Sequence, residues 1–132
     1  MALYAIGDLQ GCHEEFVELL APALGDPGAV YLDGTLGMGG HAEAILERCP
    51  AAHLVGIDRD PQAEAQFASF SDEVACATRF IRGNYADVLP DLLDEGLEAD
   101  LLYLDLGISS LQVDTRERGF SYAYDAPLDM RM

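Results

Sequence analysis

Residues 29–40 read AVYLDGTLGMGG, a short apolar segment that runs directly into a glycine-rich loop. The apolar and β-branched residues predict a strand over residues 29–33, and a helical pattern follows over residues 41–48. Glycines in such a loop let a ligand approach the backbone, and the start of the helix offers N–H groups to an anion. The segment therefore predicts either a ligand-binding strand–loop–helix unit or a simple tight turn between a strand and a helix.

The alternation of strands and helices continues along the chain. Further strands are expected over residues 3–7, 53–58, 78–82 and 100–105. Further helices are expected over residues 14–24, from a first turn that contains Pro61, and over residues 88–95. Apolar strands that alternate with helices are typical of a parallel sheet covered on both faces. The sequence therefore predicts an α/β fold, whereas residues 106–132 show no clear period.

Three of the expected strands end in or next to an acidic residue, namely Asp33, Asp58 and Asp105. Ligands of doubly wound sheets bind beyond the carboxyl ends of the strands, so these acids are candidates for a binding site. Asp58 follows Gly40 by 18 residues, the position from which an acid accepts hydrogen bonds from both hydroxyls of a ribose. The glycine spacing G-x-x-G-x-G-G differs from the dinucleotide pattern G-x-G-x-x-G, so these residues indicate a nucleoside-bearing cofactor without identifying it.

Composition limits the classes of protein to consider. The 132 residues suit one domain, and 7 Lys+Arg against 24 Asp+Glu give a net charge of −17. A chain this acidic does not bind nucleic acid through its overall field. No apolar run approaches the roughly 20 residues that span a bilayer, so no membrane partner is expected. Three scattered cysteines (Cys12, Cys49 and Cys76) indicate free thiols in a reducing compartment, and we expect a cytoplasmic location.

Five strings together resemble one enzyme family, the bacterial 16S rRNA cytosine-N4 methyltransferases called RsmH or MraW. They are VYLDGTLGMGGH (residues 30–41), VGIDRDP (55–61), GNY (83–85), DLGISSLQVD (105–114) and RGFSYAYDAPLDMRM (118–132). The resemblance covers residues 17–132 in family order and spacing. It implies a Rossmann-like, S-adenosylmethionine-dependent methyltransferase core with strand order 3-2-1-4, and small-subunit rRNA as the substrate.

The resemblance also implies site residues. Those matching the family's cofactor contacts are Gly39, Gly40 and His41 in the loop, Asp58 at the ribose, Tyr85 beside the adenine where the family usually has Phe, and Asp105 and Gln112. The catalytic candidates are Asp105, Ser109 and Ser110, which would orient the target amine and line its pocket. Plainer alternatives are a helix-start residue for His41, ordinary packing for Tyr85, and a polar loop that only caps the strand for the catalytic candidates.

Two departures from the family affect the prediction. The chain stops at Met132 inside a family motif, so we expect a truncated sheet with only the first four core strands and an exposed fourth strand that favours homo-oligomers. Residues 5–12 (AIGDLQGC) resemble instead the start of the symmetrical diadenosine tetraphosphatases, in which Asp8 would ligate metal, but the other metal motifs of that fold are absent from this sequence. No metal site is therefore predicted.

The two resemblances together predict a single α/β domain over residues 1–132. It would consist of a phosphatase-like head (1–16) and a partial methyltransferase core (17–132), with residues 3–7 pairing beside the fourth strand. The leading interpretation is an S-adenosylmethionine-binding domain derived from an rRNA methyltransferase, with weak or no activity. The alternatives are a non-catalytic chimeric scaffold that associates through its sheet edge and a metallophosphoesterase.

Overall fold

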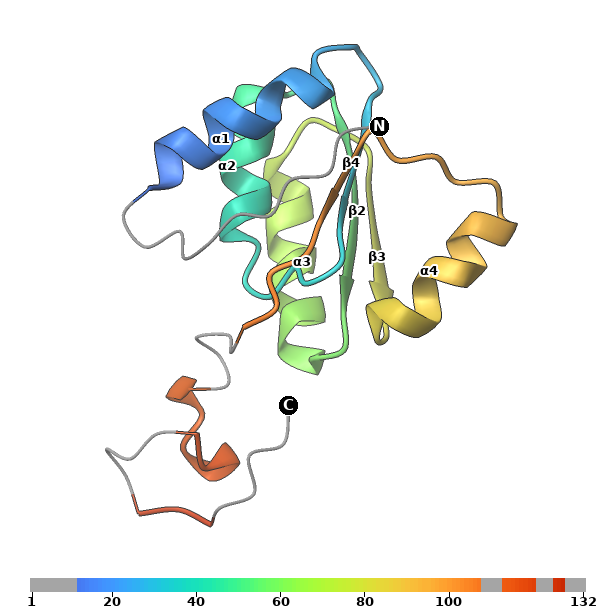
Figure 1. The fold of residues 1–132 in the computed structure, drawn as a ribbon. Coiled ribbons are helices and arrows are strands. Elements are labelled where there is room, and N and C mark those ends of the chain that lie inside the picture. Colours follow the sequence, from blue (N-terminus) through green and yellow to red (C-terminus); the bar gives the residue numbers. More distant parts are fainter. Residues whose placement is uncertain (1–11, 108–112, 121–124, 128–132) are drawn as a thin grey trace.

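The computed structural model describes residues 12–107, 113–120 and 125–127, which form an α/β fold (Figure 1). Its helices and strands follow one another in the order α1 (His13–Leu20), η1 (Ala21–Leu24), β1 (Val30–Asp33), α2 (Gly40–Arg48), β2 (His53–Asp58), α3 (Pro61–Glu73), β3 (Thr78–Arg82), α4 (Tyr85–Asp94), β4 (Leu101–Tyr103) and η2 (Arg116–Arg118). In these described parts of the chain, no helix is both long enough and apolar enough to cross a membrane.

The four strands form one parallel sheet in the order β3-β2-β1-β4. The register places Tyr31 of β1 opposite Leu54 of β2 and Leu101 of β4, and Leu54 also pairs with Thr78 of β3. The predicted strand order 3-2-1-4 is therefore confirmed. Because all four strands are parallel, their carboxyl ends meet along one edge of the sheet.

Helices cover both faces of the sheet, as the apolar strands require (Figure 1). On one face, α1, α2 and α3 pack against Tyr31 and Leu54, which are almost completely buried. On the other face, α4 packs through Leu92 against a smaller cluster that includes Leu32 and Ile57. Adjacent residues of β1 thus belong to different cores, the alternation expected of a strand buried on both sides.

Two helix boundaries differ by more than one residue from the sequence-based expectation. The regular turns of α1 end at Leu20 and continue as the 3-10 turn η1, which contains Pro22, a residue with no N–H to donate to a preceding α-helical turn. Helix α4 begins at Tyr85, three residues before the expected start, because the Asn84 side chain accepts a hydrogen bond from Ala86 N and caps the helix.

The expected strand over residues 3–7, and its pairing beside β4, lie outside the described residues. Cys12, Cys49 and Cys76 are free thiols.

Candidate functional site

The glycine-rich loop after β1 lies at the carboxyl edge of the sheet, where hydrogen bonds tie it to both neighbouring strands. Gly34 N donates to Tyr103 O of β4 at 2.9 Å, and Leu36 N donates to Ile57 O of β2 at 3.1 Å. On the β4 side, Asp105 N donates to Thr35 Oγ1 at 2.7 Å. The loop is therefore fixed between the ends of β2 and β4, at the position where ligands of such sheets bind.

Asp58, the predicted ribose acid, is placed by two backbone amides. Its Oδ2 accepts from Gly37 N in the loop, and its Oδ1 accepts from Asp60 N at the start of α3, both at 2.8 Å. A carboxylate has about four acceptor positions, so two remain for further donors. Asp58 is only partly buried, and its carboxylate can therefore still accept hydrogen bonds from a pair of hydroxyl groups.

Gly39 and Gly40 lie where the glycine-rich loop ends and α2 begins. Gly39 has a φ of +82°, in the left-handed region that favours glycine, and as the N-cap residue it supplies no side-chain hydrogen bond to the helix. Helices α3 and α4 are capped by Asp60 and Asn84, so among these three helices only α2 begins without a side-chain cap. The amides of its first turn have no acceptor inside the helix, and a carboxylate ligand would satisfy them. An added Cβ at Gly39 or Gly40 would meet no atom within 4 Å, so there is space beside the backbone for a ligand.

His41, the next residue of α2, lies in a cluster of aromatic rings. Its ring stacks on His13 with centroids 5.7 Å apart and meets the edges of Phe16 at 5.1 Å and Tyr103 at 5.4 Å. Burial lowers the pKa of His41, although Asp105 acts in the opposite direction. The imidazole of His41 therefore packs between aromatic side chains of α1 and β4, next to the glycine-rich loop.

Tyr85 is the first residue of α4 and lies beside the start of the glycine loop. It packs against the core cluster on the α4 face, and its Cβ would be 3.4 Å from a Cβ added at Gly34. Tyr85 is only half-buried, so its side chain is not completely enclosed by the core. The position suits both the predicted contact with a purine and ordinary packing.

The catalytic candidates are only partly placed. Asp105 lies two residues beyond β4, is exposed, and is fixed by its backbone hydrogen bond to Thr35. Burial, together with the nearby charges of Asp105 and Asp33, raises the pKa of Tyr103 to about 12. The structure therefore brings Asp105 next to the glycine-rich loop, which also contacts Asp58 through Gly37 N. Ser109, Ser110 and Gln112 lie outside the described residues.

Asp33 at the end of β1 is one of the three acids expected at the binding edge, but its burial at 1% exposure was not predicted. Its Oδ2 accepts from Tyr31 Oη at 3.0 Å, and its Oδ1 accepts from Thr35 N at 3.1 Å. Burial raises the pKa of Asp33 to about 6, and the two hydrogen bonds limit that rise. The buried Asp33 carboxyl therefore fixes the start of the glycine-rich loop through its hydrogen bond from Thr35 N.

A second feature missed by the sequence analysis is an ion pair between Asp60 and Arg118. Arg118 Nη1 donates to Asp60 Oδ2 at 2.5 Å, and the two side chains are 20% and 7% exposed. The guanidinium lowers the pKa of the Asp60 carboxyl. Asp60 before Pro61 is a recognisable N-cap, but no local pattern links it to an arginine 58 residues further along the chain.

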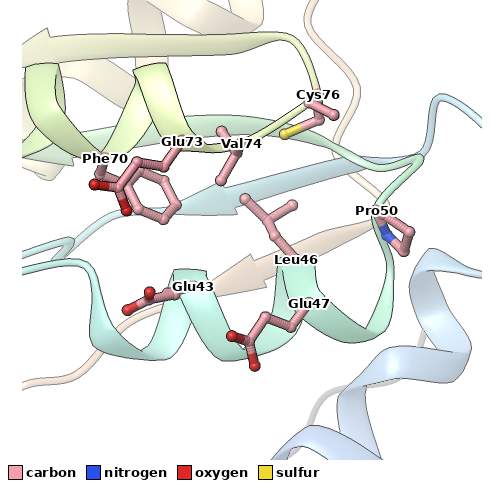
Figure 2. A pocket seen from close by; sticks show the side chains of 9 residues that line it. Glu43, Leu46, Glu47, Pro50, Phe70, Glu73, Val74 and Cys76 are labelled. Carbon is pink, nitrogen blue, oxygen red and sulfur yellow. The ribbon is translucent and has the colours of Figure 1, made fainter.

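A separate hollow of about 340 Å³ lies between α2 and α3 (Figure 2). Its floor is formed by apolar residues such as Leu46 and Phe70, and carboxylates of Glu43, Glu47 and Glu73 surround it. No group of three or more His, Cys, Asp or Glu side chains in the described part of the chain is arranged to hold a metal ion. Because this hollow includes none of the predicted site residues, the candidate site is the carboxyl edge.

Comparison with known proteins gives a consistent result. The MraW methylase family matches residues 12–132. "Ribosomal RNA small subunit methyltransferase H" of Thermobifida fusca is 50% identical over 125 residues, and the same-named proteins of Salinispora arenicola and Nocardioides sp. are 49% and 53% identical. These matches cover 90%, 96% and 90% of this chain, and the chain spans 36%, 36% and 38% of the length of those relatives.

A solved structure supports the fold. NSun6 from Pyrococcus horikoshii with SFG has a TM-score of 0.52 and 19% sequence identity, and covers 80% of this chain and 29% of its own. That likeness is to the fold alone. The comparisons do not support the expected phosphatase-like head, because the family match begins at residue 12 and the Salinispora arenicola methyltransferase aligns with 96% of the chain.

Proposed function

Since the chain belongs to the MraW methylase family, we propose that the carboxyl edge of its sheet binds S-adenosylmethionine. The observation that carries this proposal is the placement of Asp58. Its carboxylate is fixed by Gly37 N and Asp60 N, retains acceptor positions for two hydroxyls, and adjoins a loop with open space at Gly39 and Gly40.

The residues present fit the parts of this cofactor. The uncapped amides at the start of α2, beside Gly40 and His41, suit the methionyl carboxylate. Asp58 accepts from the ribose hydroxyls, and the half-buried ring of Tyr85 supplies an apolar surface for the adenine. Gln112 completes the proposed contacts by resemblance. When bound, the cofactor supplies an electrophilic methyl group on a sulfonium.

We further propose that the reaction is methyl transfer to the exocyclic N4 amine of a cytosine in small-subunit rRNA. The relatives' names give small-subunit ribosomal RNA as what they methylate, the cytosine N4 amine comes from the family resemblance of the sequence motifs, and the chain matches about a third of the relatives' length. Asp105 would orient the amine and accept its hydrogen bond, with Ser109 and Ser110 beside the base. Residues 106–132 carry four acids and three Arg, so this stretch repels an RNA backbone far less than the acidic remainder of the chain does.

A thermal-unfolding titration with S-adenosylhomocysteine tests the binding proposal. Ligand at a hundred times its Kd stabilises the folded state by about 2.7 kcal/mol, which raises Tm by roughly 10 °C for a domain of this size. The Asp58→Ala variant is the matched control and should show little of this rise. An unchanged Tm of the wild-type chain at saturating ligand would contradict the proposal.

A second candidate function is association between copies through the open edge of the sheet, and it rests on β4. Among the described residues, β4 pairs with β1 alone, and Leu102 on this strand is 49% exposed. An unpaired edge with exposed apolar side chains is a template for another strand.

We place the protein in the cytoplasm, where its free thiols remain reduced and where its proposed rRNA substrate is found.

A further inference from the structure

The ion pair between Arg118 and Asp60 joins two parts of the chain that lie 58 residues apart. Asp60 is 7% exposed, so its carboxylate has little access to water and depends on protein partners. One oxygen accepts from Arg118 Nη1, and the other accepts from Gln62 N at 2.9 Å as the cap of α3. Among the described residues, the cation paired with Asp60 is Arg118, which comes from the segment 113–120.

The backbone of Asp60 in turn holds the proposed ribose acid. Asp60 N donates to Asp58 Oδ1 at 2.8 Å, while Gly37 N holds Oδ2 from the opposite side. Because the Asp58 carboxylate accepts one hydrogen bond from each of these two amides, its orientation depends on the position of the Asp60 backbone. A continuous set of contacts therefore runs from Arg118 through Asp60 to Asp58.

Electrostatics connects the same three groups. Asp58 and Asp60 are separated by one residue, so two acidic side chains lie close together in the chain. The Asp60 and Asp58 carboxylates both raise the pKa of Arg118, so the guanidinium interacts with both acids. Removing this cation would leave the Asp60 carboxylate buried without its ion-pair partner and would favour a movement of Asp60 towards solvent.

We propose that Arg118 is a positioning residue of the cofactor site, which acts through Asp60 to hold the Asp58 carboxylate in the orientation that accepts the ribose hydroxyls. The inference rests on the proposed function, in which Asp58 is the ribose acid. A residue far along the chain would then determine selectivity for a ribose without contacting it. A purely structural role for the ion pair makes a different prediction, since loss of stability alone would not alter selectivity between sugars.

The test compares S-adenosylhomocysteine with its 2′-deoxyribose counterpart by titration calorimetry. The wild-type chain should prefer the ribose ligand by about tenfold to a hundredfold, the range expected when one hydrogen bond to a charged group is removed. Arg118→Gln should bind S-adenosylhomocysteine more weakly and bind the deoxy ligand almost unchanged, so that the preference largely disappears. Arg118→Lys should restore part of it, because the charge remains while the planar fork is lost.

Two further variants make the result specific. Arg79→Gln removes an exposed ion pair with Glu95 away from the site and should leave both affinities unchanged. The double variant Asp60→Asn with Arg118→Gln keeps an N-cap on α3 and leaves no buried unpaired carboxylate, so it is expected to fold even where Arg118→Gln does not. Loss of the ribose preference should persist in the double variant.

The outcomes separate the inference from the proposed function. A wild-type preference that survives in both Arg118→Gln and the double variant would overturn the inference and leave the cofactor site intact. A wild-type chain that binds neither ligand, or binds both equally, would overturn the assignment of Asp58 as ribose acid and the inference with it.

Discussion

The carboxylate of Asp58 and the amide of Gly37 lie 2.8 Å apart, so the end of β2 is tied directly to the glycine loop that follows β1. The contact spans 21 residues of sequence and closes the loop against its neighbouring strand. A side chain that shapes the loop and still has acceptor positions free is well suited to position a ligand at the same place. Its removal should therefore affect both the loop and ligand binding.

Replacing Asp58 with Ala should weaken binding of S-adenosylhomocysteine by tenfold or more. The variant loses the acceptor for the ribose hydroxyls, and each hydrogen bond to a charged group contributes about 1.5–3 kcal/mol. Titration calorimetry below the unfolding temperature measures the change. Asp72→Ala, on the exposed surface of α3, is the matched control. Equal affinities of the two variants would show that Asp58 does not contact the ligand.

Replacing Gly40 with Ala should separate ligand binding from folding. Gly40 is the first residue of α2, its φ is not in the left-handed region, and an added Cβ has open space around it. The change should leave the free energy of unfolding unaltered or increase it by about 0.5–1 kcal/mol, because Ala is the better helix former. The methyl group would nevertheless occupy the proposed ligand space, and affinity for S-adenosylhomocysteine should fall. Urea unfolding and calorimetry on the same preparation test both parts, and an unchanged affinity would place the ligand elsewhere.

The buried Asp33 should make stability depend on pH in a defined direction. Its pKa rises from an ordinary 3.8 to about 6 on folding, so between these values the folded state binds more protons than the unfolded state. Stability contributed by this group therefore falls as pH rises through that window, by at most about 3 kcal/mol. Asp33→Asn does not ionise, and its Oδ1 can still accept from Thr35 N while its Nδ2 donates to Tyr31 Oη, whose own hydrogen bond to residue 33 is thereby reversed.

The measurement for Asp33 is a double difference. Urea unfolding of the wild type and of Asp33→Asn at pH 4.5 and at pH 7.5 gives the free energy of unfolding for each. The Asn variant should gain stability relative to the wild type at the higher pH. A relative stability that is flat, or that falls with pH, would show that Asp33 ionises normally in the folded protein.

Most of the fold could be predicted because its signals are local. The strands over residues 53–58 and 78–82 have the predicted bounds, since each is a short apolar run between turns. The start of α4 was predicted too late because the apolar pattern begins at Val88, whereas the Asn84 cap fixes the first turn. Periodicity marks the buried face of a helix, and capping chemistry marks its end.

The candidate site was predictable to the same extent. Asp58 ends β2, Asp105 lies two residues beyond β4, and Gly39 and Gly40 belong to the loop and helix that follow β1, so a parallel sheet brings them to one edge. The ion pair between Asp60 and Arg118 could not be predicted, because it joins the cap of α3 to a stretch without periodicity. The near-complete burial of Asp33 could not be predicted either, because an acid at the end of a strand is as readily exposed to a ligand as enclosed by the fold.

Tyr85 should contribute its ring face and not its hydroxyl. Tyr85→Phe retains the aromatic surface beside Gly34 and should bind S-adenosylhomocysteine with an affinity close to that of the wild type. Tyr85→Ala should weaken binding about tenfold, in line with the loss of an aromatic contact and its buried area. Val88→Ala, in the same core cluster, controls for lost packing. Equal losses in the Val88 and Tyr85 alanine variants would make Tyr85 a packing residue only.

The open edge of β4 should cause association that a single charge abolishes. Leu102 is 49% exposed on this strand, and Leu106 just beyond it is 75% exposed. Strand pairing between copies would satisfy the outer backbone groups of β4 and cover these side chains. Light scattering after size exclusion, over a wide range of protein concentration, should show the wild type shifting towards a dimer and Leu102→Lys remaining a monomer. Leu93→Lys alters an equally apolar but more exposed residue on α4 and should associate like the wild type. A wild type that stays monomeric throughout, or a Leu93→Lys variant that loses association as fully as Leu102→Lys, would rule out the β4 edge as the interface.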